Sequence, residues 1–418
     1  MPASEVSAYS QAVDSGLYAR VTGLRGKYDH VRVFWEDQAA RAFLRPHLQP
    51  MVDERIRRNR DLRLLDLGCG GGDGIETLFS LCRAGAGFDG DDVRLIPRDR
   101  LERYTGIDIN PGLLDQARRR HQSEAQAVFL QADLRRGLPF GAGEPPYDVY
   151  FTSYGTLSHF DDASLARLLC DVVRHAEPGA LVVGDWLGRY AYEWTTLWDA
   201  DCSREQWMDY RISYIYSREE RQGREIQSFP LRLLCPEEIL RVTARVEEAT
   251  GRRLILKTFF DRSLFVGRHM ETGDYNPRAI PLRSRVNSLH QPLQRTDLGA
   301  LLFELDLPDG YPRPSETLRS ANASWNALVR YTREALRRFE GEPAQAGEAP
   351  EDAPEPAQPL LKRMARVIQA ARWLDPDDAR SEFVEPQLGL ALRDLEQAAQ
   401  SGRACGHSLI GVFEIRDA

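Results

Sequence analysis

The sequence predicts an α/β fold with a Rossmann-like, seven-stranded and mostly parallel sheet. Three observations predict it. Short apolar stretches typical of buried strands alternate with helical patterns through the first 185 residues. A glycine-rich loop, Gly68–Gly74, follows the first of these strands. Three acids, Asp66, Asp108 and Asp133, end successive strands, and the carboxyl edge of the strands is where such sheets bind ligands.

The elements of the sheet follow one another at regular spacing. Strands are expected at 63–67, 104–108, 127–131, 147–152 and 180–185. Helical periodicity covers 27–48 and 161–175, and Pro46 and Pro50 are expected to end the first of these helices. Asn110 and Pro111 have the residue types of a helix cap and a first helical turn. This alternation favours a sheet covered by helices on both faces.

The regular alternation ends after Asp185. Nine aromatic residues lie within the 31 residues from Trp186 to Tyr216, against 9% aromatic residues in the whole chain. A helix is expected from Pro236 to a C-terminal cap at Gly251. Two strands, 254–260 and 263–269, are expected to form a hairpin that closes the sheet.

The rest of the chain is expected to form separate segments. Residues 1–24 are interpreted as an arm, 25–270 as the sheet domain with a cap at 186–235, and 271–340 as an extension. Residues 341–359 hold five prolines and five acids without a basic residue, which is typical of a linker. Residues 360–418 are expected to be helical and to end in a strand at 408–415, pairing with a strand at 300–305.

Composition limits the class of protein. The chain has 55 basic and 63 acidic residues, and this net charge of −8 disfavours a nucleic-acid partner. Six cysteines without a C-x-x-C pair and eight dispersed histidines predict free thiols and no metal site. No apolar run approaches the roughly 18 residues of a membrane span, and Met1–Gly16 has no apolar signal core. We therefore expect a cytoplasmic protein without a membrane partner.

Four ordered motifs carry a family resemblance. They are Asp66-x-Gly68-x-Gly70-x-Gly72, Tyr104-x-Gly106-x-Asp108, Asp133, and the strand from Tyr147 to Ser153. Together they resemble the motifs of class I S-adenosylmethionine-dependent methyltransferases, over about residues 25–270. The spacing from Gly72 to Asp108 is long for that family, because residues 84–100 form an expected insertion loop. A dinucleotide-binding oxidoreductase is disfavoured, because Asp73 stands where the third glycine of G-x-G-x-x-G belongs.

The resemblance implies S-adenosylmethionine as cofactor and assigns contacts to it. The methionine part would be held by Asp66, Gly68, Cys69, Gly70 and Gly72, the ribose by Asp108, and the adenine by Ile109, Asp133 and Leu134. Ser153 and Tyr154 would lie beside the sulfonium. Tyr28, on a helix that often closes over the cofactor in such enzymes, is a further expected contact. The alternative for Asp66 and Asp133 is a purely structural capping role.

Catalysis of methyl transfer needs alignment above all, which can supply about 7–11 kcal/mol of the barrier. A hydroxyl acceptor also profits from a general base, worth about 10²–10⁴-fold. His159, after the fourth strand, is the first candidate and Tyr154 the second, with Asp185 a weaker one. The alternative is that His159 caps the helix that begins near Asp161.

The aromatic cap is expected to bind the methyl acceptor. Its candidate contacts are Trp186, Tyr190, Trp194, Arg211 and Tyr214, because aromatic rings wall pockets and guanidinium groups pair with carboxylates. The expected activity is methylation of nitrogen or oxygen in a small organic molecule. The alternatives are an RNA cap-like or protein acceptor, a non-catalytic cofactor-binding protein, and an aminopropyl transferase. The cap could instead pack on itself or on another subunit, as in a homodimer.

Overall fold

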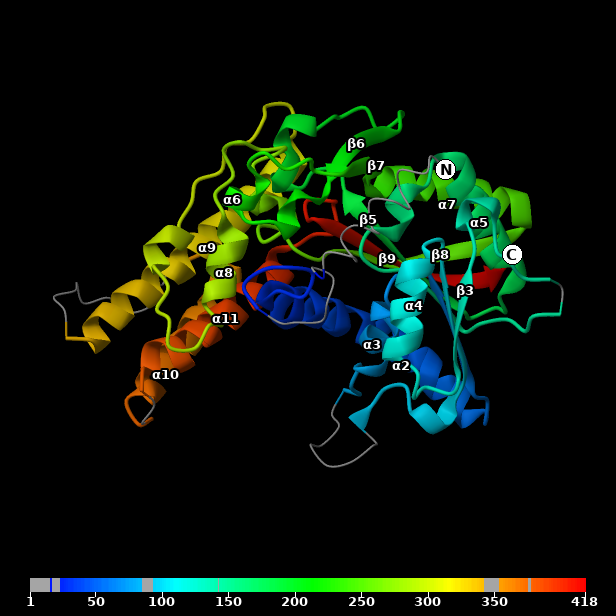
Figure 1. Cartoon of the computed structure of the whole chain (residues 1–418), viewed down its shortest axis with the longest axis horizontal. Coiled ribbons are helices and arrows are strands. Elements are labelled where there is room, and N and C mark those ends of the chain that lie inside the picture. Colours follow the sequence, from blue (N-terminus) through cyan, green and yellow to red (C-terminus); the bar gives the residue numbers. More distant parts are fainter. Residues whose placement is uncertain (1–15, 17–22, 85–92, 142, 342–352, 375–376) are drawn as a thin grey trace.

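The computed structural model describes residues 16, 23–84, 93–141, 143–341, 353–374 and 377–418 (Figure 1). Most of the predicted arm 1–24, much of the loop 84–100 and most of the linker 341–359 lie outside the described residues. Among the described helices, none combines the length and the apolar character that a membrane crossing requires.

The described strands form a single sheet of nine strands. They are β1 (Leu62–Leu67), β2 (Leu101–Asp108), β3 (Ala127–Gln131), β4 (Val149–Phe151), β5 (Leu181–Gly188), β6 (Gln206–Arg211), β7 (Ser228–Leu234), β8 (Arg252–Asp261) and β9 (Ser408–Asp417). The main path runs β3-β2-β1-β4-β5-β7-β6, and β9 pairs with both β5 and β8. Every pairing from β3 to β5, and that of β5 with β7, is parallel. The predicted fold class is confirmed, with two strands more than the seven expected.

Helices cover both faces of the sheet. The longer ones in its first part are α2 (Asp37–Arg57), α3 (Asp73–Phe79), α4 (Pro111–Arg120), α5 (Asp162–His175) and α7 (Pro236–Thr250). Consecutive strand residues point to opposite faces, so Leu64 packs in one core with residues of α2 and α3, and Leu65 packs in another with residues of α5 and α7. The Asn110 side chain caps α4, and Gly251 ends α7 at φ 66°, as predicted.

The remaining helices are short or lie in the C-terminal part. They are the π-helices Arg32–Glu36 and Arg380–Val384, the 3₁₀-helices Arg98–Arg100, Leu134–Arg136, Thr156–His159, Tyr192–Leu197, Ile212–Ile215, Arg268–Glu271, Leu298–Leu301 and Glu355–Ala357, and α6 (Arg218–Arg221), α8 (Leu282–Ser288), α9 (Pro312–Phe339), α10 (Gln358–Ala371) and α11 (Glu385–Ala399).

The first helix contradicts one prediction. Pro46 and Pro50 lie inside α2 and do not end it. An interior proline costs a helix about 3 kcal/mol, but α2 buries Leu44, Leu48 and Val52 against the sheet. Burial of such side chains contributes about 1.5–3 kcal/mol each, so the three together offset the cost of the two prolines.

The end of the sheet contradicts two further predictions. The expected hairpin of 254–260 and 263–269 is wrong, because β8 pairs with β9 and residues 263–267 form no strand. The expected pairing of 300–305 with 408–415 is also wrong: 298–301 is a 3₁₀-helix, and β9 lies between β5 and β8. The first eight β9 residues are buried except Glu414, as suits a strand covered on both faces.

One long segment, residues 262–407, separates β8 from β9, and we call it the insert. Its helices α8 to α11 gather beside the sheet, on the left in Figure 1. Their apolar faces share one core, which includes Trp325, Leu328 and Leu392 together with Trp35 from the N-terminal part. The sheet therefore extends beyond the boundary 25–270 expected from the sequence, since its strand β9 follows the insert.

Candidate active site

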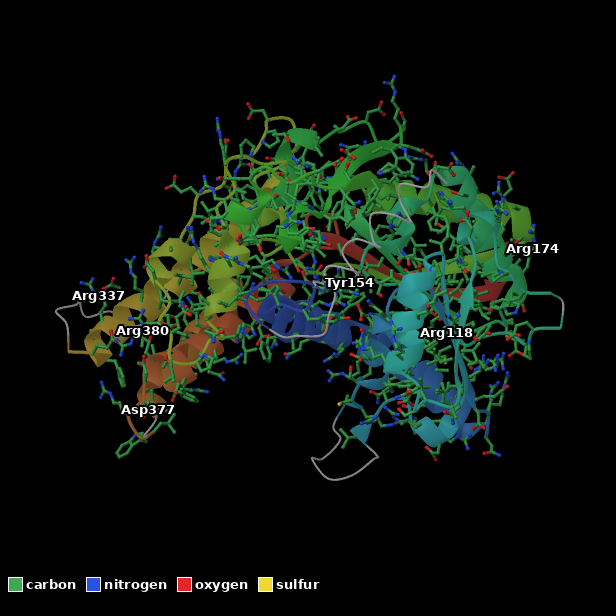
Figure 2. All side chains as sticks on the ribbon, viewed as in Figure 1. Arg118, Tyr154, Arg174, Arg337, Asp377 and Arg380 are labelled. Atoms are coloured by element: carbon green, nitrogen blue, oxygen red, sulfur yellow. The ribbon has the colours of Figure 1, made fainter. Side chains whose placement is uncertain are left out.

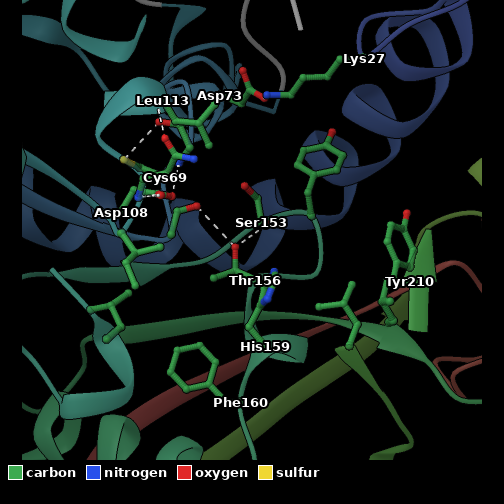
Figure 3. Close-up of a pocket in the computed structure, with 18 of the residues that line it drawn as sticks. Lys27, Cys69, Asp73, Asp108, Leu113, Ser153, Thr156, His159, Phe160 and Tyr210 are labelled. Carbon is green, nitrogen blue, oxygen red and sulfur yellow. Dashed lines mark hydrogen bonds and ion pairs between the residues drawn. The ribbon is translucent and has the colours of Figure 1, made fainter. Parts of the chain in front are cut away.

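A cavity of about 230 Å³ opens at the carboxyl edge of the sheet (Figure 3). Two groups of residues line it. The loop side comprises Gly68, Cys69, Gly70, Asp73, Asp108, Ile109, Asp133, Leu134 and Ser153. The aromatic side comprises Tyr154, His159, Phe160, Leu187, Tyr210, Tyr214, Leu231, Arg262, Arg268 and His407. The cavity thus joins strand ends of the sheet to both ends of the insert.

The glycine loop requires glycine for two reasons. Gly68, Gly70 and Gly72 have φ of 75°, 51° and 86°, a region that glycine adopts without steric cost. A Cβ on Gly68 would lie 2.3 Å from Cγ2 of Thr156, whereas one on Gly70 would meet nothing within 4 Å. Gly68 and Gly70 line the cavity, while Gly72 lies behind it as the N-cap of α3. The loop therefore offers bare backbone to a ligand.

Asp108 is positioned by the backbone of the loop. Its Oδ2 accepts from the Gly70 N–H at 2.9 Å and its Oδ1 from the Asn110 N–H at 2.8 Å. Burial raises the pKa of Asp108 above its ordinary value, although these backbone N–H groups oppose the shift. Each carboxylate oxygen can accept a further hydrogen bond, so the group can bind the two hydroxyls of a ribose.

Asp133 and its neighbours line the far end of the loop side. Asp133 accepts from the backbone N–H of Arg135 at 3.1 Å and from its guanidinium at 2.8 and 2.9 Å. These hydrogen bonds lower the pKa of Asp133. Ile109 and Leu134 add apolar surface to the same cavity. The predicted structural and ligand roles of Asp133 are therefore compatible.

Three predicted cofactor contacts do not line the cavity. Asp66 is fully buried beneath the loop, where its Oδ2 accepts from the Tyr104 hydroxyl at 2.5 Å. Burial raises the pKa of Asp66 to about 7. Tyr28 donates its hydroxyl to Asp73, and Gly72 faces His121. These residues support the loop from behind.

Asp73 is a loop-side residue that the sequence did not assign to the ligand. It lies within 2.9 Å of Lys27 Nζ, 2.6 Å of Arg120 and 3.3 Å of Arg32. Burial alone would raise the pKa of Asp73, but these cations together hold it well below its ordinary value. Lys27 and Asp73 adjoin at the rim of the cavity in Figure 3. The cluster fastens the N-terminal segment to the glycine loop.

Tyr154 joins the two sides of the cavity and lies near the middle of the molecule (Figure 2). Asp185 accepts from the backbone N–H of Tyr154 at 2.7 Å and of Gly155 at 3.0 Å, which holds Tyr154 at φ 57°. The guanidinium carbons of Arg32 and Arg262 lie 3.1 and 4.0 Å from its ring centroid. Burial raises the pKa of Tyr154 well above its ordinary value, so it keeps its proton.

His159 lines the cavity, on the turn after β4, with its ring centroid 5.6 Å from that of Phe229. Burial, assisted by Arg135, lowers the pKa of His159 to about 4. The ring is therefore neutral near pH 7 but a weak base. The alternative that His159 caps the next helix is wrong, because Asp161 does so by accepting from the Ser164 N–H at 2.7 Å.

Of the five predicted acceptor contacts, one lines the cavity and four do not. Tyr214 lines the cavity. Trp186 and Trp194 are buried in the cap, and the Trp194 indole N–H donates to the Gly188 carbonyl at 2.8 Å. Tyr190 reaches Cys202 Sγ at 3.3 Å, and Arg211 lies 3.5 Å from Asp274. These four build the cap and do not line its cavity.

Four polar residues on the aromatic side had not been assigned from the sequence: Tyr210, Arg262, Arg268 and His407. Arg262 bonds Asp185 at 3.0 Å, and Arg268 donates to the Lys27 carbonyl at 3.1 Å. Tyr210 belongs to the aromatic-rich cap, which was its only signal. The other three lie near the two ends of the insert, and no local motif marks them.

Cys202, Cys235 and Glu238 are grouped closely enough among the described residues to hold a metal ion. Arg189 lies 2.8 Å and Arg232 3.5 Å from Glu238. These two guanidinium groups already neutralise the carboxylate and would repel a cation. The expectation of no metal site stays a prediction.

Comparisons with known proteins agree with this geometry. Residues 64–179, from within β1 to two residues before β5, match a family described as a methyltransferase domain. The chain therefore carries a methyltransferase domain of the S-adenosylmethionine-dependent class, and S-adenosylmethionine is its cofactor. No curated protein matches the chain in sequence.

Solved structures of the same class resemble the chain more distantly. One is an S-adenosylmethionine-dependent methyltransferase from Clostridium acetobutylicum, with 14% identity over 61% of this chain and 90% of that chain, and a TM-score of 0.34. Another is CalS10, an amino pentose methyltransferase from Micromonospora echinaspora, with 19% identity over 53% and 85% of the chains and a TM-score of 0.31. A third is the sugar N-methyltransferase KedS8 from Streptoalloteichus, with 18% identity over 53% and 81% and a TM-score of 0.33. Likeness at this level carries no argument about the acceptor.

The loop side fits the cofactor. Gly68 and Gly70 turn bare backbone to the cavity, and Asp108 keeps acceptor capacity for a diol. Ile109 and Leu134 offer apolar contact to a flat base. When bound, S-adenosylmethionine supplies an electrophilic methyl group. The residues of this chain would hold and align it.

Proposed function

We propose that the protein transfers a methyl group from S-adenosylmethionine to nitrogen or oxygen of a small organic molecule. The observation that carries the proposal is the single cavity that joins the loop side to the aromatic side at Ser153 and Tyr154. A donor held on the loop side and an acceptor held on the aromatic side would meet there.

The composition of the aromatic side supports a small acceptor. Leu187, Tyr210, Tyr214 and Leu231 wall it with apolar and aromatic surface, which is typical of small-molecule sites. Its cationic groups are already engaged, Arg262 with Asp185 and Arg268 with the Lys27 carbonyl. They form part of an enclosed wall, unlike the exposed basic surface of a nucleic-acid site.

Calorimetric titration with S-adenosylhomocysteine tests the first half of the proposal. We expect saturable binding at one site per chain, and no saturable binding would refute the proposal. Mass spectrometry of a metabolite panel incubated with S-adenosylmethionine tests the second half. Cofactor binding without any methylated product would favour the non-catalytic alternative, and methylation of RNA or protein would replace the small acceptor.

A further inference from the structure

A buried histidine–carboxylate pair faces the aromatic side of the cavity. His407 Nδ1 lies 2.7 Å from Glu193 Oε1, and both side chains are buried. His407 also lines the cavity, on its aromatic side. Glu193 comes from the cap and His407 from the end of the insert, 214 residues away along the chain. No short-range motif connects them.

The topology of the sheet brings His407 to this edge. Strand β9 runs antiparallel to β5, with Ser408 opposite Leu187. An antiparallel strand begins where its neighbour ends, so the residue just before β9 lies at the carboxyl edge of β5. The Gly188 N–H donates to the His407 carbonyl at 3.3 Å, and the His407 N–H to the Ser263 carbonyl at 2.8 Å. The backbone of His407 is thus fixed on both sides.

The hydrogen bonds of Glu193 select one tautomer of His407. Its Oε2 accepts from the His269 backbone N–H at 2.5 Å, so only Oε1 is directed to the imidazole. Burial alone would raise the pKa of Glu193, but the contacts with His407 and His269 bring that pKa below its ordinary value. An ionised carboxylate only accepts hydrogen bonds, so in the neutral ring Nδ1 carries the proton and Nε2 has the free electron pair.

The surroundings of the two cavity histidines differ. Beside His407 lie the Glu193 carboxylate, the Trp194 ring at 5.4 Å, and Arg262, which donates to Ser408 Oγ at 2.5 Å. Arg268 lines the same wall. His269 is neutral, because burial lowers its pKa to about 3. The Glu193 carboxylate in contact with His407 stabilises an imidazolium. The positive charge of Arg135 near His159 instead destabilises an imidazolium there.

We propose that the acceptor is a hydroxyl compound and that His407 Nε2, held by Glu193, is the base that takes its proton. This rests on the proposed function. The acceptor oxygen bonds the methyl carbon as the carbon–sulfur bond breaks, and that electron pair stays on sulfur as a neutral thioether. The hydroxyl proton goes to Nε2, and the imidazolium then releases it to water. Glu193 is a positioning residue that fixes the tautomer and balances the imidazolium charge.

The tautomer can be measured without knowing the acceptor. In protein labelled with ¹⁵N-histidine and saturated with S-adenosylhomocysteine, a multiple-bond ¹H–¹⁵N spectrum at pH 8 distinguishes the three ring states. The His407→Gln variant assigns the signal. We expect the Nδ1–H tautomer in the wild type, a mixture of tautomers in Glu193→Gln, and restoration in Glu193→Asp. An Nε2–H tautomer or an imidazolium at pH 8 in the wild type overturns the proposal.

Measurement of turnover is the second test of the role of His407. The panel pairs phenols and alcohols with amines of the same shape. We expect methylation of the hydroxyl members, a loss of about 10²–10⁴-fold in kcat in His407→Gln, and a loss of less than about 10-fold in the matched variant His159→Gln. Methylation of the amines alone, or a larger loss in His159→Gln, overturns the assignment of His407. If the panel gives no product, the tautomer decides.

Binding separates this proposal from the one on which it rests. If the wild type does not bind S-adenosylhomocysteine, the methyltransferase function fails, whatever the state of His407. If it binds and the tautomer is wrong, only the assignment of His407 fails. We expect His407→Gln to bind S-adenosylhomocysteine within about 3-fold of the wild type, because His407 lies on the aromatic side.

Discussion

The two sides of the cavity are assembled in different ways. The loop side takes its residues from the ends of neighbouring parallel strands, within the span 68–153. The aromatic side combines the cap with residues 262, 268 and 407, which lie near the two ends of the insert. One side is therefore fixed by local motifs, and the other by the antiparallel entry of β9. We therefore expect that substitutions on one side leave ligand binding on the other side unchanged.

The energetics follow the same division. Backbone hydrogen bonds shape the loop side, as between Asp108 and the Gly70 and Asn110 N–H groups. Buried ion pairs between distant segments support the aromatic side: Arg262 with Asp185, and Arg283 of the insert with Asp29 and Glu36. Removing one partner of a buried pair leaves an uncompensated charge, which costs more than the loss of an exposed pair.

The largest effect is expected from Arg283→Met. Arg283 Nε lies 2.6 Å from Asp29 and its Nη1 2.8 Å from Glu36, all three side chains being buried. The variant removes the cation of Asp29 and leaves Glu36 with Arg268 at 3.8 Å, so we expect the free energy of unfolding to fall by about 3–5 kcal/mol. Guanidinium denaturation followed by circular dichroism measures it.

The matched control is Arg278→Met. Arg278 pairs with Asp306 at the surface, with side-chain exposures of 72% and 54%, and exposed pairs contribute about 0–1 kcal/mol. Equal losses in the two variants would show that the insert does not depend on its buried pair. A large loss in Arg283→Met alone would locate the dependence there.

The second effect concerns the loop side alone. Asp108→Ala removes the acceptor of the Gly70 and Asn110 N–H groups and the expected ribose contact. Hydrogen bonds to charged groups contribute about 1.5–3 kcal/mol each, so we expect S-adenosylhomocysteine to bind about 10²-fold more weakly by calorimetry. The control is Asp274→Ala, outside the cavity wall. Unchanged affinity in Asp108→Ala would remove Asp108 from the site.

The sequence predicted the two sides unequally for a physical reason. Gly68, Asp108 and Asp133 could be identified because a strand end and a turn residue are adjacent in the chain, and parallel strands bring such ends together. His407 could not be, because its place depends on which strand β9 pairs with. The nearly continuous apolar run of 408–415 suits several partner strands, and the predicted pairing with 300–305 is wrong. Aromatic density predicted a cap but did not separate Tyr214 from the buried Trp194.

The third prediction tests the role of Asp66 behind the loop. In the folded protein burial raises the pKa of Asp66 to about 7, against an ordinary 3.8. The unfolded chain releases this proton above about pH 4, while the folded protein keeps it to about pH 7, so Asp66 destabilises the fold progressively as pH rises across that window. Above it both states are ionised and the slope ends.

Asp66→Asn removes this dependence. At about 1.4 kcal/mol per pKa unit, the free energy of unfolding of the wild type should fall by about 2–3 kcal/mol more than that of Asp66→Asn between pH 5 and pH 8. Denaturation of both proteins at the two pH values measures the difference. If the free energies of unfolding of the two proteins changed in parallel with pH, Asp66 would already be ionised at pH 5. An ionised Asp66 is what a direct contact to a cationic group of the ligand would require.

The smallest effect is expected where the two sides meet. Tyr154→Phe keeps the ring between Arg32 and Arg262 and loses only the hydroxyl that donates to Asp37. We expect a loss of about 1.5 kcal/mol in the free energy of unfolding and S-adenosylhomocysteine affinity within about 3-fold of the wild type. Tyr154→Leu also removes the ring that separates two guanidinium groups, so its loss should be larger. If Tyr154→Phe instead abolished turnover while still binding S-adenosylhomocysteine, Tyr154 would have to move a proton, and the aromatic side would hold a second reacting residue beside His407.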